Sequence, residues 1–267
     1  MTHRDFGHRT EDLLAEVRDG ILFLTINRAD HYNSWTSALR DEFARRFREA
    51  ESDDAVIGAV ITGAGDKAFC AGQHLPELED FADGTRIHQW FERLIQCYDA
   101  IRGFSKPLVA AVNGVAAGSG FQVTQFCDLV IAHPGVRLGQ TEINSGLPSV
   151  FGTWLMWERV GRHAIQLALQ GQLLSAEQAQ ALGFVHHVVA REAVLDEAIA
   201  AVRRLCEQPR VAYRLSKRAN RDFDQDRYMN AMRVAEEYYV QAFDEGAPQA
   251  EIARFFERRA QRKSVAA

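Results

Sequence analysis

Two glycine-containing segments are the places where this chain could present backbone N–H groups to a bound oxygen atom. They are residues 68–73 (AFCAGQ) and residues 113–120 (NGVAAGSG), and each follows an expected strand. Glycines at the end of a strand let the backbone turn sharply and let a ligand approach closely. Two such loops side by side would aim two N–H groups at one oxygen atom, which is how an oxyanion hole works. From these residues alone, two tight turns that serve only packing remain the alternative.

The second loop leads into a segment, residues 121–126, that reads as the start of a helix. The first N–H groups of a helix lack partners within the helix and lie at the positive end of its dipole. Neither loop is a phosphate-binding loop, because no Gly-Lys-Ser/Thr follows and the Rossmann spacing of glycines is absent. The four cysteines are Cys70, Cys97, Cys127 and Cys206, and their wide spacing fits no zinc or redox motif. We therefore expect free thiols, and neither a metal nor a redox cofactor is suggested.

Composition narrows the class of protein. The chain has 267 residues, 47% of them apolar and 25% charged, which suffices for one hydrophobic core with a small helical annex. Its formal net charge of −5 gives no nucleic-acid footprint. Residues 1–20 lack the apolar centre of a secretory signal, and no apolar run approaches the roughly 20 residues that span a bilayer. We expect a cytoplasmic protein without nucleic-acid or membrane partners.

Elements that would carry the two loops alternate along the chain. Apolar runs predict strands, and apolar residues at four-residue spacing predict amphipathic helices. The expected strands are residues 21–27, 56–62, 108–112, 129–132 and 185–189, and the expected helices are 36–50 and 86–103. Strands that alternate with helices indicate an α/β architecture.

The last part of the chain has a different pattern. Residues 192–264 contain no convincing strand, and their apolar residues recur at helical spacing around a turn at residues 246–248. We therefore divide the chain into a core of residues 1–191 and a helical region of residues 192–267.

The motifs taken together resemble the crotonase (enoyl-CoA hydratase/isomerase) superfamily over about residues 12–260. In chain order they are NRADHYNS, AFCAG, KPLVAAVNGVAAGSG, CDLVIA, LGQTEINSGLP and LLSAEQAQALGFVHHVV. The resemblance implies an α/β spiral of ββα units, followed by a helical region that packs homotrimers, often paired into homohexamers. It also implies an acyl-CoA substrate from reactions such as those of fatty acid metabolism. Coenzyme A would be part of that substrate, so no separate cofactor is expected.

The same resemblance assigns the reacting groups. The thioester oxygen would lie between the backbone N–H groups of Gln73 and Ser119, where losing one donor typically costs about 3 kcal/mol. Glu142 would be the acid/base. Gln122 stands where hydratases of the family carry another glutamate, and an amide cannot take a proton at neutral pH. Gln122 would either position a polar group or be an inert replacement. We expect double-bond isomerisation, or hydration by one acid.

Further positions follow from the resemblance. Those expected to contact coenzyme A are Arg28, His31, Ala71, Gln73 and Leu75. Those expected to line the substrate pocket are Trp35, His74, Gly118, Leu147, Tyr238 and Tyr239. Relatives that hydrate and cleave aryl-propenoyl thioesters need a tyrosine from the C-terminal region, which could be either tyrosine here. Because His31 and Tyr32 replace basic residues, Arg28 or the basic run 254–263 would have to meet the CoA phosphates. A core role for Trp35 and a surface role for His74 remain alternatives.

Two other functions stay open at this point. The first is a hydrolase of the same fold that cleaves a carbon–carbon bond or a thioester, with His74 as a candidate acid or base. The second is a non-catalytic relative that only binds acyl-CoA. These three hypotheses differ in whether a Glu142→Gln change abolishes turnover, and in whether coenzyme A binds at all.

Overall fold

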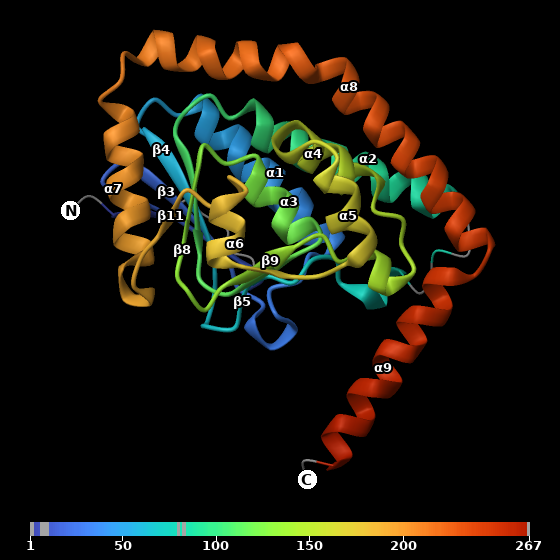
Figure 1. The fold of residues 1–267 in the computed structure, drawn as a ribbon. Helices are drawn as coiled ribbons and strands as arrows, with labels where there is room; N and C mark the ends of the chain where they lie inside the picture. The colour runs from blue at the N-terminus through green and yellow to red at the C-terminus, as the bar shows by residue number, and fades with distance from the viewer. Residues whose placement is uncertain (1–2, 6–10, 79–80, 82–83, 266–267) are drawn as a thin grey trace.

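A computed structural model describes residues 3–5, 11–78, 81 and 84–265 (Figure 1). Its larger sheet has seven strands in the order β1-β2-β3-β4-β6-β8-β11. Neighbours from β3 to β11 are parallel, whereas β1 and β2 run antiparallel to their neighbours. The bounds are β1 His3–Asp5, β2 Leu13–Arg18, β3 Ile21–Ile26, β4 Gly58–Gly63, β6 Leu108–Val112, β8 Leu129–Ala132 and β11 His187–Val188.

A smaller sheet lies at the carboxyl ends of the parallel strands. It has four strands in the order β10-β9-β7-β5, namely Leu174–Ser175, Arg137–Gly139, Val115–Ala117 and Ala68–Cys70. The pairs β4/β5, β6/β7 and β8/β9 each place one strand in each sheet. Helix α3 (Ser119–Gln125) follows β7 after one residue, and α2 (Gly84–Gly103) follows β5 after the short helix η2 (Leu75–Leu78), which gives the repeating ββα unit. The predicted crotonase-like spiral is therefore confirmed, while this second sheet is an element that the strand patterns did not predict.

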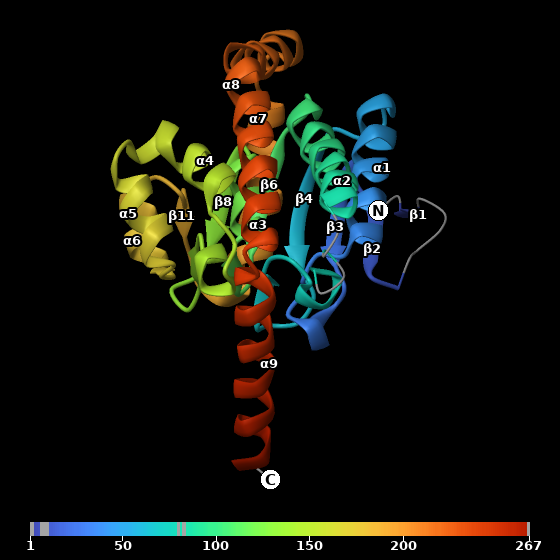
Figure 2. The same cartoon turned by 90° about the vertical axis from the view of Figure 1, so that its right-hand side faces the viewer.

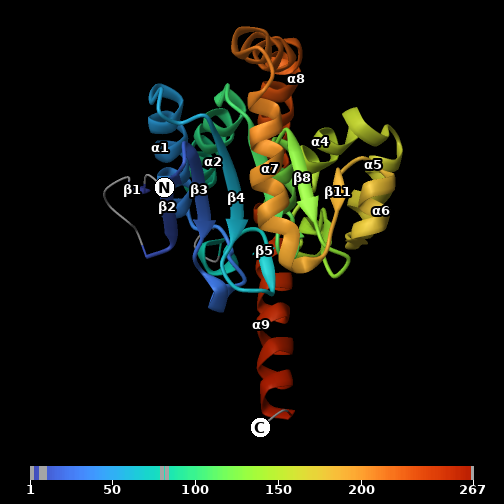
Figure 3. The ribbon, with the colours of Figure 1, turned by 90° about the vertical axis from the view of Figure 1, so that its left-hand side faces the viewer.

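Helices cover both faces of the larger sheet (Figures 1 and 3). Helices α1 (Ser37–Ser52), α2 (Gly84–Gly103) and α3 (Ser119–Gln125) lie on one face, and α7 (Val194–Cys206) packs on the other against β4, β6 and β8. Strands buried on both sides need continuous apolar sequence, and all five residues of β6 are buried. Helix α1 begins one residue after its predicted start, because the side chain of Thr36 caps it by accepting a hydrogen bond from the N–H of Leu39, at 3.1 Å.

The C-terminal part is helical, as predicted. After α4 (Val150–Val160), α5 (His163–Gln170), α6 (Ala176–Ala181) and α7, a 35-residue helix α8 (Arg210–Asp244) runs along the outside of the body. The chain turns at Gly246, whose φ is +77°, and Ala247 and Pro248 already belong to α9 (Ala247–Val265). Figure 2 shows α9 extending beyond the body. The division at residue 191 stays a prediction, and α7 belongs by its packing to the sheet sandwich.

Short 3-10 helices complete the chain: η1 (Ala29–His31), η2 (Leu75–Leu78), η3 (Glu142–Ser145) and η4 (Arg191–Ala193). The expected strand 185–189 is reduced to two residues, and the helix expected from residue 121 begins at Ser119. All four cysteines are free, as predicted. Within the described ranges, every helix is too short or too polar to cross a bilayer.

Candidate active site

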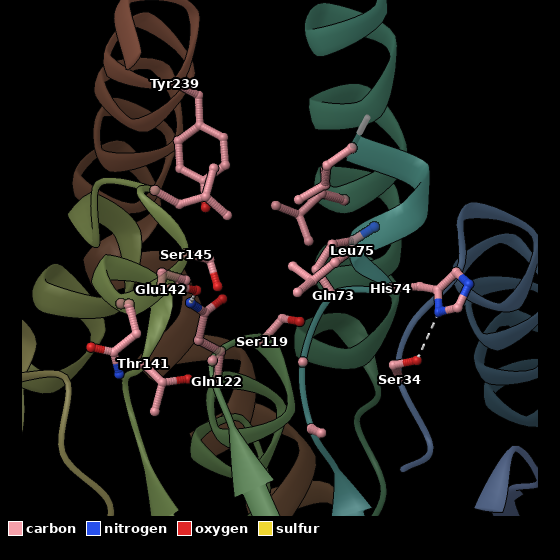
Figure 4. A pocket seen from close by; sticks show the side chains of 18 of the residues that line it. Ser34, Gln73, His74, Leu75, Ser119, Gln122, Thr141, Glu142, Ser145 and Tyr239 are labelled. Carbon is pink, nitrogen blue, oxygen red and sulfur yellow. Dashed lines mark hydrogen bonds between the residues drawn. The ribbon is translucent and has the colours of Figure 1, made fainter. Parts of the chain in front are cut away.

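A cavity of about 630 Å³ lies where the two glycine loops, η3 and the helices α2, α8 and α9 meet. Figure 4 shows Gln73 and Leu75 on one wall, Gln122 and Glu142 on the opposite wall, and Tyr239 of α8 above Glu142 and Ser145. Ser119 lies between the two walls. The cavity therefore collects residues from both predicted loops and from the helical region. Its volume is in the range of typical small-molecule sites.

The two glycine loops lie side by side because their strands pair. Strand β5 pairs with β7 in parallel, with Cys70 opposite Ala116. A Cβ atom on Gly72 would lie 2.9 Å from the carbonyl oxygen of Ala117 and 3.7 Å from the backbone nitrogen of Ser119. The left-handed φ of +96° at Gly72 adds to the need for glycine there. The backbone at residues 72–73 thus adjoins the N–H of Ser119.

The N–H groups of Gln73 and Ser119 have no acceptor among the described residues. Gln73 pairs in a parallel bridge with Trp35. The N–H of Trp35 donates to the carbonyl of Gly72, and its carbonyl accepts from the N–H of His74, so the bridge leaves the N–H of Gln73 without an acceptor. Ser119 is the first residue of α3, so its N–H has no partner within the helix. Two free N–H groups near one another are what an oxyanion hole requires.

The carboxyl group of Glu142 reaches this junction through the next strand. Strand β9 pairs with β7, and the N–H of Gly118 donates to the carbonyl of Gly139 at 3.0 Å. The chain then enters η3, whose first residue is Glu142. A Cβ atom on Gly118 would lie 3.6 Å from Oε1 of Glu142. The carboxylate therefore lies beside the peptide that precedes Ser119.

A chain of hydrogen bonds fixes this carboxylate. Tyr98 on α2 donates its hydroxyl to Oε1 of Gln122 at 2.7 Å, so the amide nitrogen of Gln122 faces Glu142 and donates to Oε1 at 2.7 Å. Ser149 donates its hydroxyl to Oε2 of Glu142 at 3.0 Å. Both ends of the Gln122 amide are therefore occupied, and both oxygens of Glu142 accept a bond.

The environment of Glu142 changes its acidity. Burial raises the pKa of its carboxyl group from 4.5 to about 7, against the opposing hydrogen bonds from Ser149 and Gln122. The group is shielded from bulk water yet remains partly accessible through the cavity. An acid with a pKa near the working pH can both accept and return a proton. Burial also raises the pKa of Tyr98 well above its usual value, so its hydroxyl stays a donor.

Most of the predicted positions line the cavity. They are His31, Ala71, Gln73, His74, Leu75, Gly118, Ser119, Gln122, Glu142, Leu147 and Tyr239. The ring of His74 turns away from Glu142 and hydrogen-bonds Ser34 at 3.1 Å (Figure 4). Burial, then the charges of Arg28 and His31, lower the pKa of His74. A neutral His74 on the far wall does not share a proton with Glu142.

The structure corrects two predicted pocket positions, Trp35 and Tyr238. Trp35 is 1% exposed and lies outside the cavity lining, because its ring packs edge-on against Phe43 in the hydrophobic core. Tyr238 is 51% exposed, since adjacent helical residues point about 100° apart and Tyr239 occupies the inward direction. Arg28 lies outside the cavity lining, where its guanidinium binds Asp12 at 2.6 Å and the Ser34 carbonyl at 3.1 Å, and its contact with coenzyme A stays a prediction.

Of the C-terminal basic run, Arg258 lines the cavity and Arg254 pairs with Glu251. The side chains of residues 259, 262 and 263 lie outside the described part.

Sequence reasoning missed Ser149 and Tyr98, the two residues that hold the Glu142–Gln122 pair. Ser149 lies seven residues after Glu142, at the N-cap of α4, and Tyr98 lies on the apolar side of α2. No local signal separates either from an ordinary cap or core residue. Searched over the described residues, His, Cys, Asp and Glu side chains form no group of three that could hold a metal ion.

Residues 16–263 match the sequence profile of the Enoyl-CoA hydratase/isomerase family. The chain is 34% identical over 222 residues to 1,2-epoxyphenylacetyl-CoA isomerase of Escherichia coli, covering 78% of this chain and 81% of that one. It is 31% identical over 213 residues to a probable enoyl-CoA hydratase of Rhizobium meliloti, covering 78% and 80%. The crystal structure of an enoyl-CoA hydratase/isomerase from Mycobacterium paratuberculosis has a TM-score of 0.84 at 25% identity, covering 92% of this chain and 98% of that one.

Proposed function

Because this chain belongs to the enoyl-CoA hydratase/isomerase family, we propose that it isomerises an unsaturated acyl-CoA thioester, with Glu142 moving the proton. One observation carries the proposal. The carboxyl group of Glu142 adjoins the junction of the two glycine loops, and its partner in the cavity is the amide of Gln122 rather than a second carboxyl group. Among the described residues that line the cavity, Glu142 is the one carboxylic acid.

The reaction needs one proton and no water. Ionised Glu142 removes a proton from the carbon between the thioester carbonyl and the double bond. The electron pair moves onto the thioester oxygen, which the N–H groups of Gln73 and Ser119 stabilise as an enolate. Protonated Glu142 then returns the proton to the far carbon of the former double bond. The double bond ends in conjugation with the carbonyl, and Glu142 is ionised again.

Hydration by a pair of acids is the weaker candidate. A second acid would have to accept or donate a proton at Gln122, and an amide does neither at neutral pH. The oxygen of Gln122 already accepts from Tyr98, and its nitrogen already donates to Glu142. The amide is therefore fully engaged in holding the carboxylate.

A turnover assay tests the proposal. Purified protein is incubated with a 3-enoyl-CoA, crotonyl-CoA and a feruloyl-type CoA, and products are followed by absorbance and mass spectrometry. We expect the 3-enoyl-CoA to give its conjugated isomer at unchanged mass, with a loss of roughly 10²- to 10⁴-fold in Glu142→Gln. Ser145→Ala, which alters another cavity residue of η3, is the matched control. A water adduct of crotonyl-CoA formed faster than the isomer would refute isomerisation as the main reaction.

Tyr239 favours a second candidate, hydration and cleavage of an aryl-propenoyl thioester. This tyrosine is 8% exposed, lines the cavity and stacks on Trp90 at 5.9 Å. Burial, then the charge of Glu142, raise the pKa of Tyr239 well above its usual value, so its hydroxyl remains a donor. An aldehyde released from the feruloyl-type thioester, and lost in Tyr239→Phe, would select this reaction. Binding of coenzyme A without turnover would instead favour a non-catalytic protein. Hydrolysis of a diketone, with no binding of coenzyme A, would favour the hydrolase.

We further propose that α8 packs subunits into a homotrimer or homohexamer. Three large apolar residues on its outer part support this: Val211 is 60% exposed, Leu215 48% and Phe223 81%. Light scattering after size-exclusion chromatography should give a multiple of the 30.0 kDa chain mass. Phe223→Glu should lower that multiple, because a charge at a subunit contact would lose its water. A wild-type monomer would contradict the proposal.

A further inference from the structure

Two buried N–H donors at one end of the cavity have no partner. Arg40 on α1 is 1% exposed and Trp90 on α2 is 6% exposed, and both line the cavity. Nη1 of Arg40 and Nε1 of Trp90 lack a hydrogen-bond partner among the described residues. The two groups are neighbours, since the guanidinium carbon of Arg40 lies 4.7 Å from the centre of the Trp90 ring. Both side chains thus place an unpartnered donor, shielded from solvent, in the wall of the cavity.

The positive charge of Arg40 is not balanced by a carboxylate. Nη2 of Arg40 donates to Oε1 of Gln73, a neutral acceptor, and no ion pair of Arg40 occurs within the described ranges. Arg46, one helical turn and a half further along α1, is equally buried but pairs with Glu42 at 2.7 Å and with Glu49 at 3.4 Å. The same helix thus holds one buried arginine with acids and one without.

This lack of an anion is energetically unusual. An arginine stays protonated in proteins, and a buried charge is stable only when it is paired and hydrogen-bonded. The face of Trp90 contributes a cation–π attraction, which is weaker than an ion pair. Glu142 does not act as the counter-ion, because the groups that bond its carboxylate are Gln122 and Ser149, and Arg40 is not among them. The missing acceptor must therefore come from a molecule bound in the cavity.

We propose that the acyl group taken by this enzyme carries a carboxylate, which binds Nη1 of Arg40 and Nε1 of Trp90. The substrate would be the mono-CoA thioester of a short dicarboxylic acid, and the inference rests on the proposed function. Gln73 limits the length of the acyl chain between the thioester and the carboxylate. Its backbone N–H is the candidate oxyanion donor, and its side chain reaches Arg40. The carboxylate would therefore lie a few carbons from the thioester. Phe91 and Leu94, which also line the cavity, would contact the methylene groups between them.

Binding of saturated, unreactive thioesters tests this independently of turnover. Isothermal titration would compare glutaryl-CoA with pentanoyl-CoA, and adipoyl-CoA with hexanoyl-CoA, so that each pair differs in the terminal carboxylate. We expect the dicarboxylic member of at least one pair to bind about tenfold or more tightly, the range for hydrogen bonds to a charged group. The ratio within a pair cancels effects on the oxyanion loop, which both members use.

Three variants of the donor site give the decisive comparison. Arg40→Met should abolish the preference for the carboxylate. Trp90→Phe, which keeps a ring but removes the N–H, should lower it by about two- to tenfold. Arg40→Lys should keep part of it, and Arg46→Met, the buried and acid-paired arginine of the same helix, should leave it intact.

The outcomes separate this inference from the proposed function. Equal affinities within both pairs, or a preference that survives Arg40→Met, would overturn the inference and mean that a solvent molecule binds these donors. Isomerisation of a neutral 3-enoyl-CoA would still stand in that case. Conversely, carboxylate-dependent binding without any isomerisation would support the donor site and reject the proposed reaction. Failure to bind all four thioesters would reject both.

Discussion

Replacing Glu142 with glutamine should stabilise the protein while it abolishes turnover. The folded protein raises the pKa of this carboxyl group from 4.5 to about 7 through burial. A raised pKa means that the folded state holds the proton more tightly than the unfolded chain does. The corresponding stability is fully present below pH 4.5 and is lost as the pH rises through about 7. The wild-type protein therefore carries a destabilising buried charge at alkaline pH, and the variant does not.

The magnitude follows from the size of the shift. A pKa change of one unit corresponds to about 1.4 kcal/mol, so the shift at Glu142 is worth about 3 kcal/mol above neutral pH. Glutamine fits the same hydrogen bonds. Its oxygen can accept from Gln122, and its nitrogen can donate to the hydroxyl oxygen of Ser149. The variant should thus gain most of that free energy, or roughly 5–10 °C in melting temperature for a chain of this size.

Unfolding measured across pH tests this reasoning without a substrate. Wild type and Glu142→Gln would be unfolded thermally at about pH 5 and about pH 8.5, at one protein concentration so that subunit association does not differ. The gap in melting temperature should open toward alkaline pH. Glu207→Gln, at an exposed residue after α7, controls for the loss of one surface charge. A gap that stays constant, or that widens toward acidic pH, would refute the burial argument for Glu142.

Three other changes probe the same site. Ser149→Ala removes a hydrogen bond that lowers the pKa of Glu142, so the lower pH limb of kcat/KM should move upward by about 1–2 units; an unmoved limb would exclude Glu142 as the titrating base. Gly72→Ala puts a Cβ atom 2.9 Å from a backbone oxygen and should cost several kcal/mol and most turnover. Gly161→Ala, at φ +54° with open space, should cost only the backbone strain of about 1–3 kcal/mol and keep turnover; equal stability losses in melting experiments would contradict the close approach. Gln122→Glu places a second acid 2.7 Å from the first, and the pair should share one proton at neutral pH and add water to crotonyl-CoA faster than the wild type; an unchanged hydration rate would mean that the amide is not what limits hydration.

The sequence by itself determined the fold class and many of the residues that form the site. Apolar runs predicted strands 108–112 and 129–132 with the bounds that the structure has, because a strand buried on both faces needs continuous apolar residues. The resemblance of the motifs to the crotonase superfamily implied the ββα spiral and the role of Glu142, and the glycine loops indicated where the site lies. The strands and the glycine loops are local features: they depend on residue type, on spacing, and on conformations that only glycine adopts without strain.

The tertiary structure decided which of those residues meet and in what chemical state. The small sheet, with strands of two or three residues, carries too little pattern to be predicted, yet its register places Gly72 beside Ser119 and Gly118 beside Glu142. The sequence does not distinguish Tyr238 from Tyr239 as the tyrosine of the pocket. Only the orientation of α8 about its axis places Tyr239 in the cavity lining.

The same holds for charge. Arg40 and Arg46 are both arginines on one amphipathic helix, and the sequence does not say that one is paired with acids while the other faces a cavity. The acidity of Glu142 likewise depends on its burial and on the hydrogen bonds from Gln122 on α3 and Ser149 at the start of α4. The contacts and the solvation of Arg40 and Glu142 come from packed helices and loops. Their pairing and their acidity are therefore fixed only when these elements have packed together.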